Sequence, residues 1–234
     1  MPSLVDWSNM RAALFDVDGT LVDSVETITL GLGDTIERFA GNRPDDDEIR
    51  SIIGTPLKQQ IERYRGTAAT SEELQEITAF AIGRFGAYRD RESDHDDAIE
   101  AMRMMRSAGL KVALITSKNR EEVDEFLPRF SGRQWIDGVV CASDVSVPKP
   151  NPESVLLACS EFNVLPSQSF LIGDSIYDMQ CAKGAGAGSV AVSYGASSLS
   201  ALRQENPDLI FDTPNGLLQW ANNQFSTTTC VARK

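Results

Sequence analysis

Residues Arg11–Ser24 read RAALFDVDGTLVDS. The apolar run Ala12–Phe15 ends directly at two carboxylates, Asp16 and Asp18, and a Gly-Thr pair follows them. A short apolar run of this kind predicts a fully buried strand. Charges at the end of such a strand are costly unless another charge compensates them, so the two aspartates suggest a bound divalent cation.

Five further short apolar runs predict further buried strands. They cover Val112–Ile115, Gly138–Cys141, Phe170–Ile172, Val190–Val192 and Leu209–Phe211. Helical patterns lie between them at Asp97–Ala108, Asn151–Phe162 and Ser175–Lys183. Strands that alternate with helices predict an α/β fold with a doubly wound parallel sheet.

The segment from about Val25 to Arg89 breaks this alternation, because it carries helical patterns and no convincing strand. We therefore expect a helical insert after the first strand. The predicted organisation is a discontinuous α/β core of residues 1–21 and 91–234 and a helical domain of residues 22–90. The aperiodic tail from Gln224 onward is expected to be frayed or disordered.

Polar side chains follow several of the predicted strands, and ligands of open parallel sheets bind beyond these strand ends. Asp16 and Asp18 follow the first predicted strand, and Thr116-Ser117-Lys118 follow the strand Val112–Ile115. Lys149 lies in a later loop. The strand Phe170–Ile172 leads to Gly173-Asp174-Ser175, and Asp178 lies one turn further on. Singly, each feature has an ordinary explanation, such as a helix cap or a solvated lysine. Together they predict one site with acidic groups, a hydroxyl and an amine.

The net charge limits the expected partners. The chain has 22 Lys and Arg against 34 Asp and Glu, a formal charge of -12. An acidic surface repels nucleic-acid backbones, so no nucleic-acid partner is expected. It also repels small phosphate esters, so an anion site requires a local cation or oriented N–H groups.

The first residues of the sequence and its cysteines allow a prediction of the cellular compartment. The first residues show no secretory signal, and no apolar stretch approaches the ~20 residues of a membrane helix. We therefore expect a cytoplasmic protein without a membrane partner, either a monomer or a homodimer. The four scattered cysteines are expected to be reduced thiols, several of them in the core: Cys141, Cys159, Cys181 and Cys230.

These motifs resemble the haloacid dehalogenase superfamily of phosphotransferases. The run DVDGT from Asp16 to Thr20 is similar to its first motif, Thr116 to its second, Lys149 to its third, and Gly173-Asp174 through Asp178 to its fourth. The helical insert resembles the first-position cap of that superfamily. Four shorter runs resemble its phosphoglycolate-phosphatase-like branch: LVDS at 21–24, GTPL at 54–57, KPNP at 149–152 and GAG at 184–186.

The resemblance implies Mg²⁺-dependent hydrolysis of a small phosphate monoester, similar to phosphoglycolate, through an aspartyl-phosphate intermediate. Asp16 is expected to be the nucleophile, because a carboxylate can attack phosphorus. Asp18 is expected to protonate the leaving oxygen and then to help deprotonate the attacking water.

The resemblance also implies ligands for the metal and the phosphoryl group. Asp16, the main-chain carbonyl of Asp18, and Asp174 are expected to bind Mg²⁺, and Asp178 either adds a ligand or supports the others. The phosphoryl group is expected to contact Gly19, Thr20, Thr116, Ser117 and Lys149. Lys149 is also expected to hold the Asp16 carboxylate in line.

The cap is expected to select the substrate by closing over the site. Thr55 and Lys58, which follow Gly54 at the start of a predicted helix, are candidates for binding a carboxylate or a second phosphate. A helix start with a solvated lysine is the ordinary alternative. The other candidates are expected to be mostly surface charge or hinge packing: Arg50, Arg63, Arg65, Arg84 and His95.

Other activities stay open within the superfamily. Asp18 argues against carbon–halogen and carbon–phosphorus cleavage, because the members with those activities lack an acid at this position. A β-phosphoglucomutase-like transferase and an inorganic pyrophosphatase share every core residue of the motifs. A receiver domain switched by phosphorylation is a more distant alternative, because its acidic pair and its phosphorylated aspartate lie on different strands.

Overall fold

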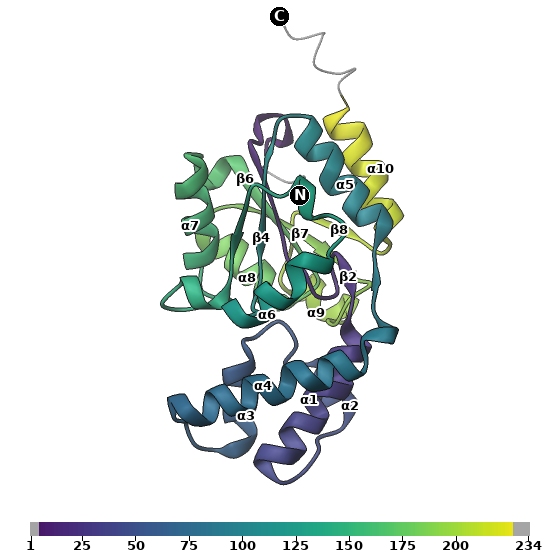
Figure 1. Ribbon diagram of the computed structural model, residues 1–234. Helices are drawn as coiled ribbons and strands as arrows, with labels where there is room; N and C mark the ends of the chain where they lie inside the picture. The colour runs from purple at the N-terminus through teal and green to yellow at the C-terminus, as the bar shows by residue number, and fades with distance from the viewer. Residues whose placement is uncertain (1–4, 227–234) are drawn as a thin grey trace, which may run out of the picture.

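A six-stranded parallel sheet forms the centre of the computed structural model, which describes residues 5–226 (Figure 1). The strand order is β5-β4-β1-β6-β7-β8, with every neighbouring pair parallel. The strands are β1 (Ala12–Phe15), β4 (Lys111–Ile115), β5 (Gly138–Val140), β6 (Ser169–Gly173), β7 (Gly188–Val192) and β8 (Leu209–Phe211). The predicted α/β fold with a doubly wound sheet is confirmed.

Helices cover both faces of this sheet. The chain forms α5 (Asp96–Ser107), α6 (Arg120–Phe126), α7 (Glu153–Phe162), α8 (Ile176–Ala185), α9 (Leu199–Gln204) and α10 (Pro214–Phe225). Along β1, Ala13 and Phe15 pack with α5 and α10, whereas Ala12 and Leu14 pack with α7 and α8. Because successive side chains of a strand point to opposite faces, a strand buried on both faces reads as an unbroken apolar run.

Several helix ends differ from the prediction, and helix α10 was not predicted. Pro152 is the N-cap of α7, so that helix begins at Glu153 and not at Asn151. Helix α8 continues past Lys183 to Ala185, where Gly186 ends it with a φ of 74°. Helix α10 continues to Phe225, whose ring stacks on Phe170 at 6.0 Å, so the expectation of fraying was wrong for Gln224 and Phe225. Residues 227–234 lie outside the described residues.

Four helices between β1 and α5 form a group of their own beside the sheet (Figure 1). They are α1 (Val25–Ala40), α2 (Asp46–Arg50), α3 (Leu57–Arg65) and α4 (Ser71–Ala87). The buried apolar side chains of this region form a separate cluster: Leu32, Ile36, Ile49, Ile52, Leu57, Ile61, Ile77 and Ala81. The helical insert after the first strand is confirmed, and we call residues 25–87 the cap. The domain boundaries at residues 22 and 90 stay a prediction.

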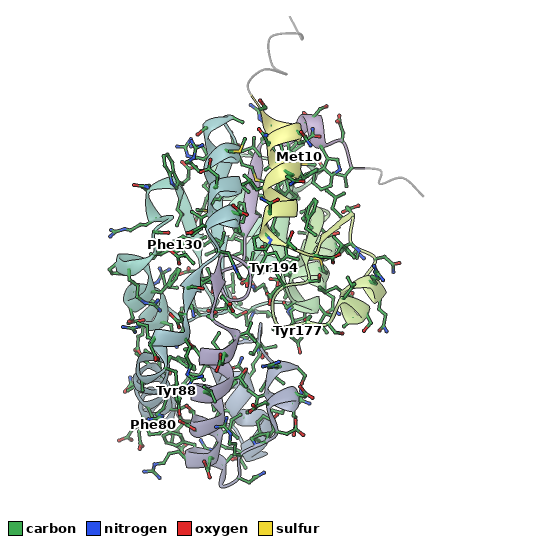
Figure 2. The ribbon with its side chains drawn as sticks, turned by 90° about the vertical axis from the view of Figure 1, so that its right-hand side faces the viewer. Met10, Phe80, Tyr88, Phe130, Tyr177 and Tyr194 are labelled. Carbon is green, nitrogen blue, oxygen red and sulfur yellow. The ribbon has the colours of Figure 1, made fainter. Side chains whose placement is uncertain are left out.

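Two short strands join the cap to the sheet. Strands β2 (Val22–Asp23) and β3 (Ser93–Asp94) pair antiparallel, so the chain enters and leaves the cap at one place. His95 follows β3, and its main-chain N–H donates to the carbonyl oxygen of Leu21 at 2.9 Å. Tyr177 of α8 lies on the side of the sheet domain that faces the cap helices (Figure 2), and its hydroxyl donates to the carbonyl oxygen of Ser51 at 3.4 Å.

Three further features of the fold bear on the sequence analysis. The Arg84 guanidinium donates to Asp34 and to the Tyr88 hydroxyl, so this arginine joins α4 to α1 within the cap. The three cysteines in the described part of the chain are buried free thiols, and Cys230 lies outside it. None of the described helices is both long enough and apolar enough to span a membrane.

Candidate active site

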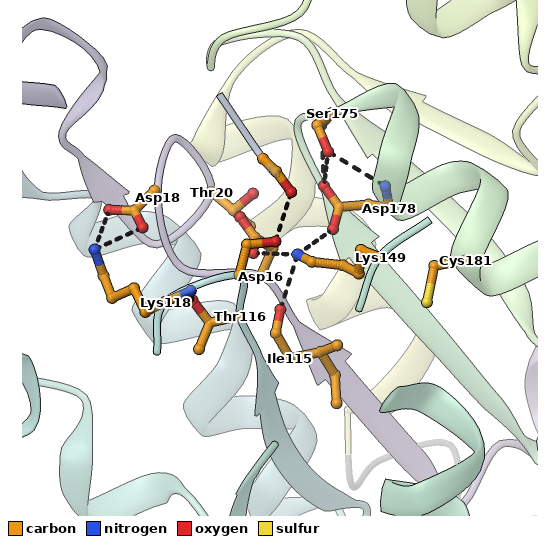
Figure 3. Close-up of polar contacts among 12 residues, drawn as sticks. Asp16, Asp18, Thr20, Ile115, Thr116, Lys118, Lys149, Ser175, Asp178 and Cys181 are labelled. Atoms are coloured by element: carbon orange, nitrogen blue, oxygen red, sulfur yellow. Dashed lines mark hydrogen bonds and ion pairs between the residues drawn. The ribbon is translucent and has the colours of Figure 1, made fainter. Parts of the chain in front are cut away.

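Lys149 lies at the centre of the candidate site and is 2 % exposed. Its ammonium donates to Asp16 Oδ1 at 2.6 Å, to Asp178 Oδ1 at 2.7 Å and to the carbonyl oxygen of Ile115 at 3.1 Å (Figure 3). Burial alone would lower the pKa of Lys149, but the two carboxylates outweigh burial and raise it. The site therefore contains a fixed positive charge next to Asp16.

Three buried carboxylates surround this amine. One oxygen each of Asp16, Asp174 and Asp178 lies within 4.8 Å of the others. Burial raises the pKa of Asp16 to about 7, with further upward contributions from Asp178 and Asp18 and an opposing one from Lys149. Burial and the Asp16 carboxylate also raise the pKa of Asp174. One ammonium does not balance three carboxylates, so this cluster of oxygen ligands fits a divalent cation.

Two glycines and an N–H group hold the Asp174 carboxylate in place. Its Oδ2 accepts a hydrogen bond of 2.6 Å from the N–H of Ala196, and the Thr20 hydroxyl lies 3.5 Å from its Oδ1. A side-chain carbon at Gly19 or Gly195 would collide with this carboxylate. Both positions must therefore lack a side chain, and the φ of +77° at Gly19 independently favours glycine.

Asp178 has both carboxylate oxygens occupied. Its Oδ1 accepts from Lys149, and its Oδ2 accepts from the N–H and the hydroxyl of Ser175 at the start of α8. The side chain is fully buried. Of the two roles that the sequence left open, these contacts favour support of Lys149 over a place among the metal ligands.

Asp18 faces a second lysine (Figure 3). Its carboxylate oxygens lie 2.8 and 3.0 Å from the ammonium of Lys118, and its Oδ1 also accepts from the Ser24 hydroxyl at 2.8 Å. Burial would lower the pKa of Lys118, but Asp18 and Glu122 outweigh burial and raise it. The sequence placed Lys118 in the same strand-end loop as Thr116, but we did not predict a role for it.

Thr116 and Ser117 follow β4, as predicted, and their side chains make different contacts. Thr116 is buried, and its hydroxyl oxygen accepts from the N–H of Lys118 at 3.2 Å. The Ser117 hydroxyl donates to the carbonyl oxygen of Gly54 at 2.5 Å, so it joins the core to the cap loop between α2 and α3. In the structure the Ser117 side chain therefore contacts the cap.

A small cavity of about 40 Å³ lies between the cap and this edge of the sheet. Its polar lining consists of Asp16, Asp18, Thr55, Gln60, Ser117, Lys118 and Glu122. We call this cavity the inner chamber. Lys58 is exposed and lines a neighbouring groove of about 430 Å³ between α3 and the loop at residues 142–148, so of the two cap candidates only Thr55 lines the inner chamber.

The loop after β7 contributes residues that the sequence analysis missed. Besides Gly195 and Ala196, it holds Tyr194, whose hydroxyl donates to the carbonyl oxygen of Thr20 at 3.1 Å. The strand-end rule that found the other site residues also applies to the predicted strand Val190–Val192. Its loop was overlooked because it holds no charged side chain.

Residues 13–192 match the family model described as haloacid dehalogenase-like hydrolase. The chain belongs to this family. The resemblance stated from the strand-end motifs is thereby confirmed, and so is the prediction of a hydrolytic enzyme. This haloacid dehalogenase-like hydrolase is also similar to named relatives over most of its length.

Two relatives carry different names for their activities. A phosphoglycolate phosphatase of Colwellia psychrerythraea is 32% identical over 88% of this chain and 94% of its own length. A pyrophosphatase, PpaX, of Bacillus velezensis is 28% identical over 89% of this chain and 95% of its own length. Among solved structures, a hydrolase of Pseudomonas syringae superposes with a TM-score of 0.79 at 22% identity, covering 92% of this chain and 99% of that one. This last likeness concerns the fold alone.

Proposed function

We propose that this hydrolase is a Mg²⁺-dependent phosphatase that releases phosphate from a small phosphate monoester similar to phosphoglycolate. The observation that carries the proposal is the buried Asp16 carboxylate, which lies 2.6 Å from Lys149 and within the Asp174 and Asp178 cluster. A carboxylate held beside fixed positive charge at the end of a central strand is suited to attack an anionic phosphoryl group.

The metal would be bound by Asp16, Asp174 and the main-chain carbonyl of Asp18. Asp178 would support this set through Lys149. When bound, Mg²⁺ supplies positive charge where the transferring phosphoryl group carries negative charge. Together with Lys149, it would overcome the repulsion between a phosphate ester and a chain of charge -12.

The chain's own residues would carry out two successive transfers. In the first, an Asp16 oxygen forms a bond to phosphorus while the bond from phosphorus to the ester oxygen breaks, and Asp18 gives that oxygen its proton. In the second, Asp18 takes a proton from water, which attacks phosphorus and restores the Asp16 carboxylate. Thr116 and the main-chain N–H groups of Asp18 and Ser117 would bind phosphoryl oxygens. The N–H groups of Gly19 and Thr20 already donate to the carbonyl oxygens of Val22 and Val17, at 2.8 and 3.2 Å.

The size of the inner chamber and the names of the relatives bear on the substrate. A cavity of about 40 Å³ favours a small leaving group. The relatives named phosphoglycolate phosphatase and pyrophosphatase support two substrates, a carboxylated phosphate ester and pyrophosphate. We propose the first and retain pyrophosphate as the alternative. A β-phosphoglucomutase-like transfer would differ from both because it releases no phosphate.

The test is a phosphate-release assay with Mg²⁺ on phosphoglycolate, pyrophosphate, glucose 1-phosphate and p-nitrophenyl phosphate. Asp16→Asn should lower turnover by at least about a thousandfold, as expected for loss of a nucleophile. The exposed Asp124→Asn is the matched control and should keep the wild-type rate. EDTA should abolish activity, and Mg²⁺ should restore it. An Asp16→Asn enzyme with normal turnover would refute the proposal.

A further inference from the structure

Lys118 has a contact that the proposed chemistry has to break. Its ammonium binds both oxygens of Asp18, and the two side chains are only 14% and 19% exposed. Ser24, the N-cap of the first cap helix, donates to the same carboxylate. In this arrangement the Asp18 side chain points toward Lys118 and Ser24. It lies beside the group formed by Asp16, Lys149 and Asp178 (Figure 3).

Asp18, the proposed acid, therefore cannot protonate the leaving oxygen while both of its carboxylate oxygens bind Lys118. If Asp18 turned away with nothing in its place, Lys118 would lose its closest partner inside a mostly buried site. Removing one partner of a buried ion pair is strongly unfavourable because it leaves an uncompensated charge. A second anion that occupies the place of Asp18 would remove this cost.

The charges in the inner chamber indicate where that anion comes from. Among the described residues that line the chamber, Lys118 is the only lysine, arginine or histidine, whereas Asp16, Asp18 and Glu122 are acidic. Glu122 is held by the N–H of Asn119 at 2.9 Å, which fixes it at the start of α6. Among the described side chains that line the chamber, Lys118 therefore offers an anionic leaving group its only positive charge.

We propose that Lys118 binds a second anionic group on the leaving part of the substrate, and that this group displaces Asp18 and frees it to face the leaving oxygen. The inference rests on the proposed function and adds to it the residue that would recognise the acidic leaving group of the substrate. Lys118 acts on the chemistry through Asp18 and is in that respect a positioning residue.

The test compares two substrates of similar size. Phosphoglycolate carries a carboxylate, and 2-hydroxyethyl phosphate carries a neutral hydroxyl in the corresponding position. Wild-type kcat/KM should favour phosphoglycolate by about tenfold to a hundredfold, the range of a hydrogen bond to a charged group. The preference should include kcat as well as KM, because the carboxylate both binds and releases Asp18.

Three variants complete the test. Lys118→Met should bring the ratio of the two kcat/KM values close to one, and Lys118→Arg should restore part of it. Lys183→Met, which removes an exposed lysine in the last turn of α8, is the matched control and should leave the ratio unchanged. Circular dichroism shows whether each variant folds.

The outcomes separate this inference from the proposed function. Equal wild-type kcat/KM for both substrates overturns the inference alone, and so does a Lys118→Met enzyme that keeps the preference. A preference confined to KM overturns the displacement of Asp18. If wild-type enzyme with Mg²⁺ releases phosphate from none of these esters nor from p-nitrophenyl phosphate, the proposed function fails and the inference fails with it.

Discussion

Lys149 donates to two buried carboxylates and one main-chain carbonyl. Lys149→Met should therefore lower the free energy of unfolding by about 3–5 kcal/mol in EDTA, the cost of breaking a buried ion pair. Mg²⁺ should recover part of the loss, because a cation bound only by the folded state stabilises it. Urea unfolding with EDTA and with Mg²⁺ measures both effects.

A surface lysine provides the control for this prediction. Lys111 pairs with Asp137 at 3.6 Å, and its side chain is 50% exposed. Lys111→Met should cost no more than about 1 kcal/mol, as is usual for exposed ion pairs. Equal stability of the Lys149→Met and wild-type proteins in EDTA would contradict the account of a charge-balanced cluster.

Gly195 tests whether Asp174 binds the metal. A side-chain carbon at this position would collide with the Asp174 carboxylate, although the backbone of Gly195 is not in the left-handed region. Gly195→Ala should therefore weaken Mg²⁺ binding by about tenfold to a hundredfold, as changes around metal ligands typically do. Calorimetric titration with Mg²⁺ measures the affinity. Unchanged affinity would argue against Asp174 as a ligand.

Helix α4 contains a glycine that weakens it without an evident packing reason. Gly83 is exposed in the interior of the helix, and apart from the backbone of its own helix no atom lies within 4 Å of the place that a side-chain carbon would occupy. Gly83→Ala should raise the free energy of unfolding by roughly 0.5–1 kcal/mol, because alanine favours helix. Urea unfolding measures the gain, kcat should stay the same, and a loss of stability would show that α4 requires the glycine.

The strands were predictable because their pattern is local, whereas several helix ends were not. Each run such as Ala12–Phe15 is apolar because helices cover both faces of the sheet. The end of α10 depends on a contact between Phe225 and Phe170, which are far apart in the sequence. An aperiodic tail contains no signal for such a contact, so the sequence analysis expected fraying at residues where the helix continues.

The same distinction applies to the candidate site. Asp16, Thr116, Lys149 and Asp174 were found because each is a polar side chain directly after or near a strand end. Ala196 contributes a main-chain N–H, and Gly195 contributes the absence of a side chain. No residue type marks such contributions. The pairing of Lys118 with Asp18 joins loops 100 residues apart, so it required the folded chain.

Two side-chain hydrogen bonds in the described part of the chain join the core to the cap loop between α2 and α3. Ser117 donates to Gly54, and Tyr177 donates to Ser51. Ser117 and Gly54 also line the inner chamber. In the proposed function, substrate recognition and the position of the cap therefore involve the same contact, and the chain crosses between the two parts at β2 and β3.

His95 lies directly after β3, where the chain leaves the cap, and we expect it to make the free energy of unfolding depend on pH. Its Nε2 is buried without a hydrogen-bond partner among the described residues, and its ring packs against Tyr194 at 4.8 Å. Burial lowers the pKa of His95 below its usual 6.5, although Asp23 and Asp94 oppose the shift. Between the folded and unfolded pKa values, the unfolded chain binds more protons, so stability decreases as the pH falls.

His95→Gln removes this titration and isolates its effect. The free energy of unfolding of the wild type relative to His95→Gln should be constant above about pH 6.5 and should decrease below it. The slope should not exceed about 1.4 kcal/mol per pH unit, the limit for one proton. Urea unfolding of both proteins at pH 7.5, 6.5 and 5.5 with equal Mg²⁺ cancels the other titrating groups. A difference that stays constant down to pH 5.5 would mean that the histidine accepts its proton as easily in the folded protein as in the unfolded chain.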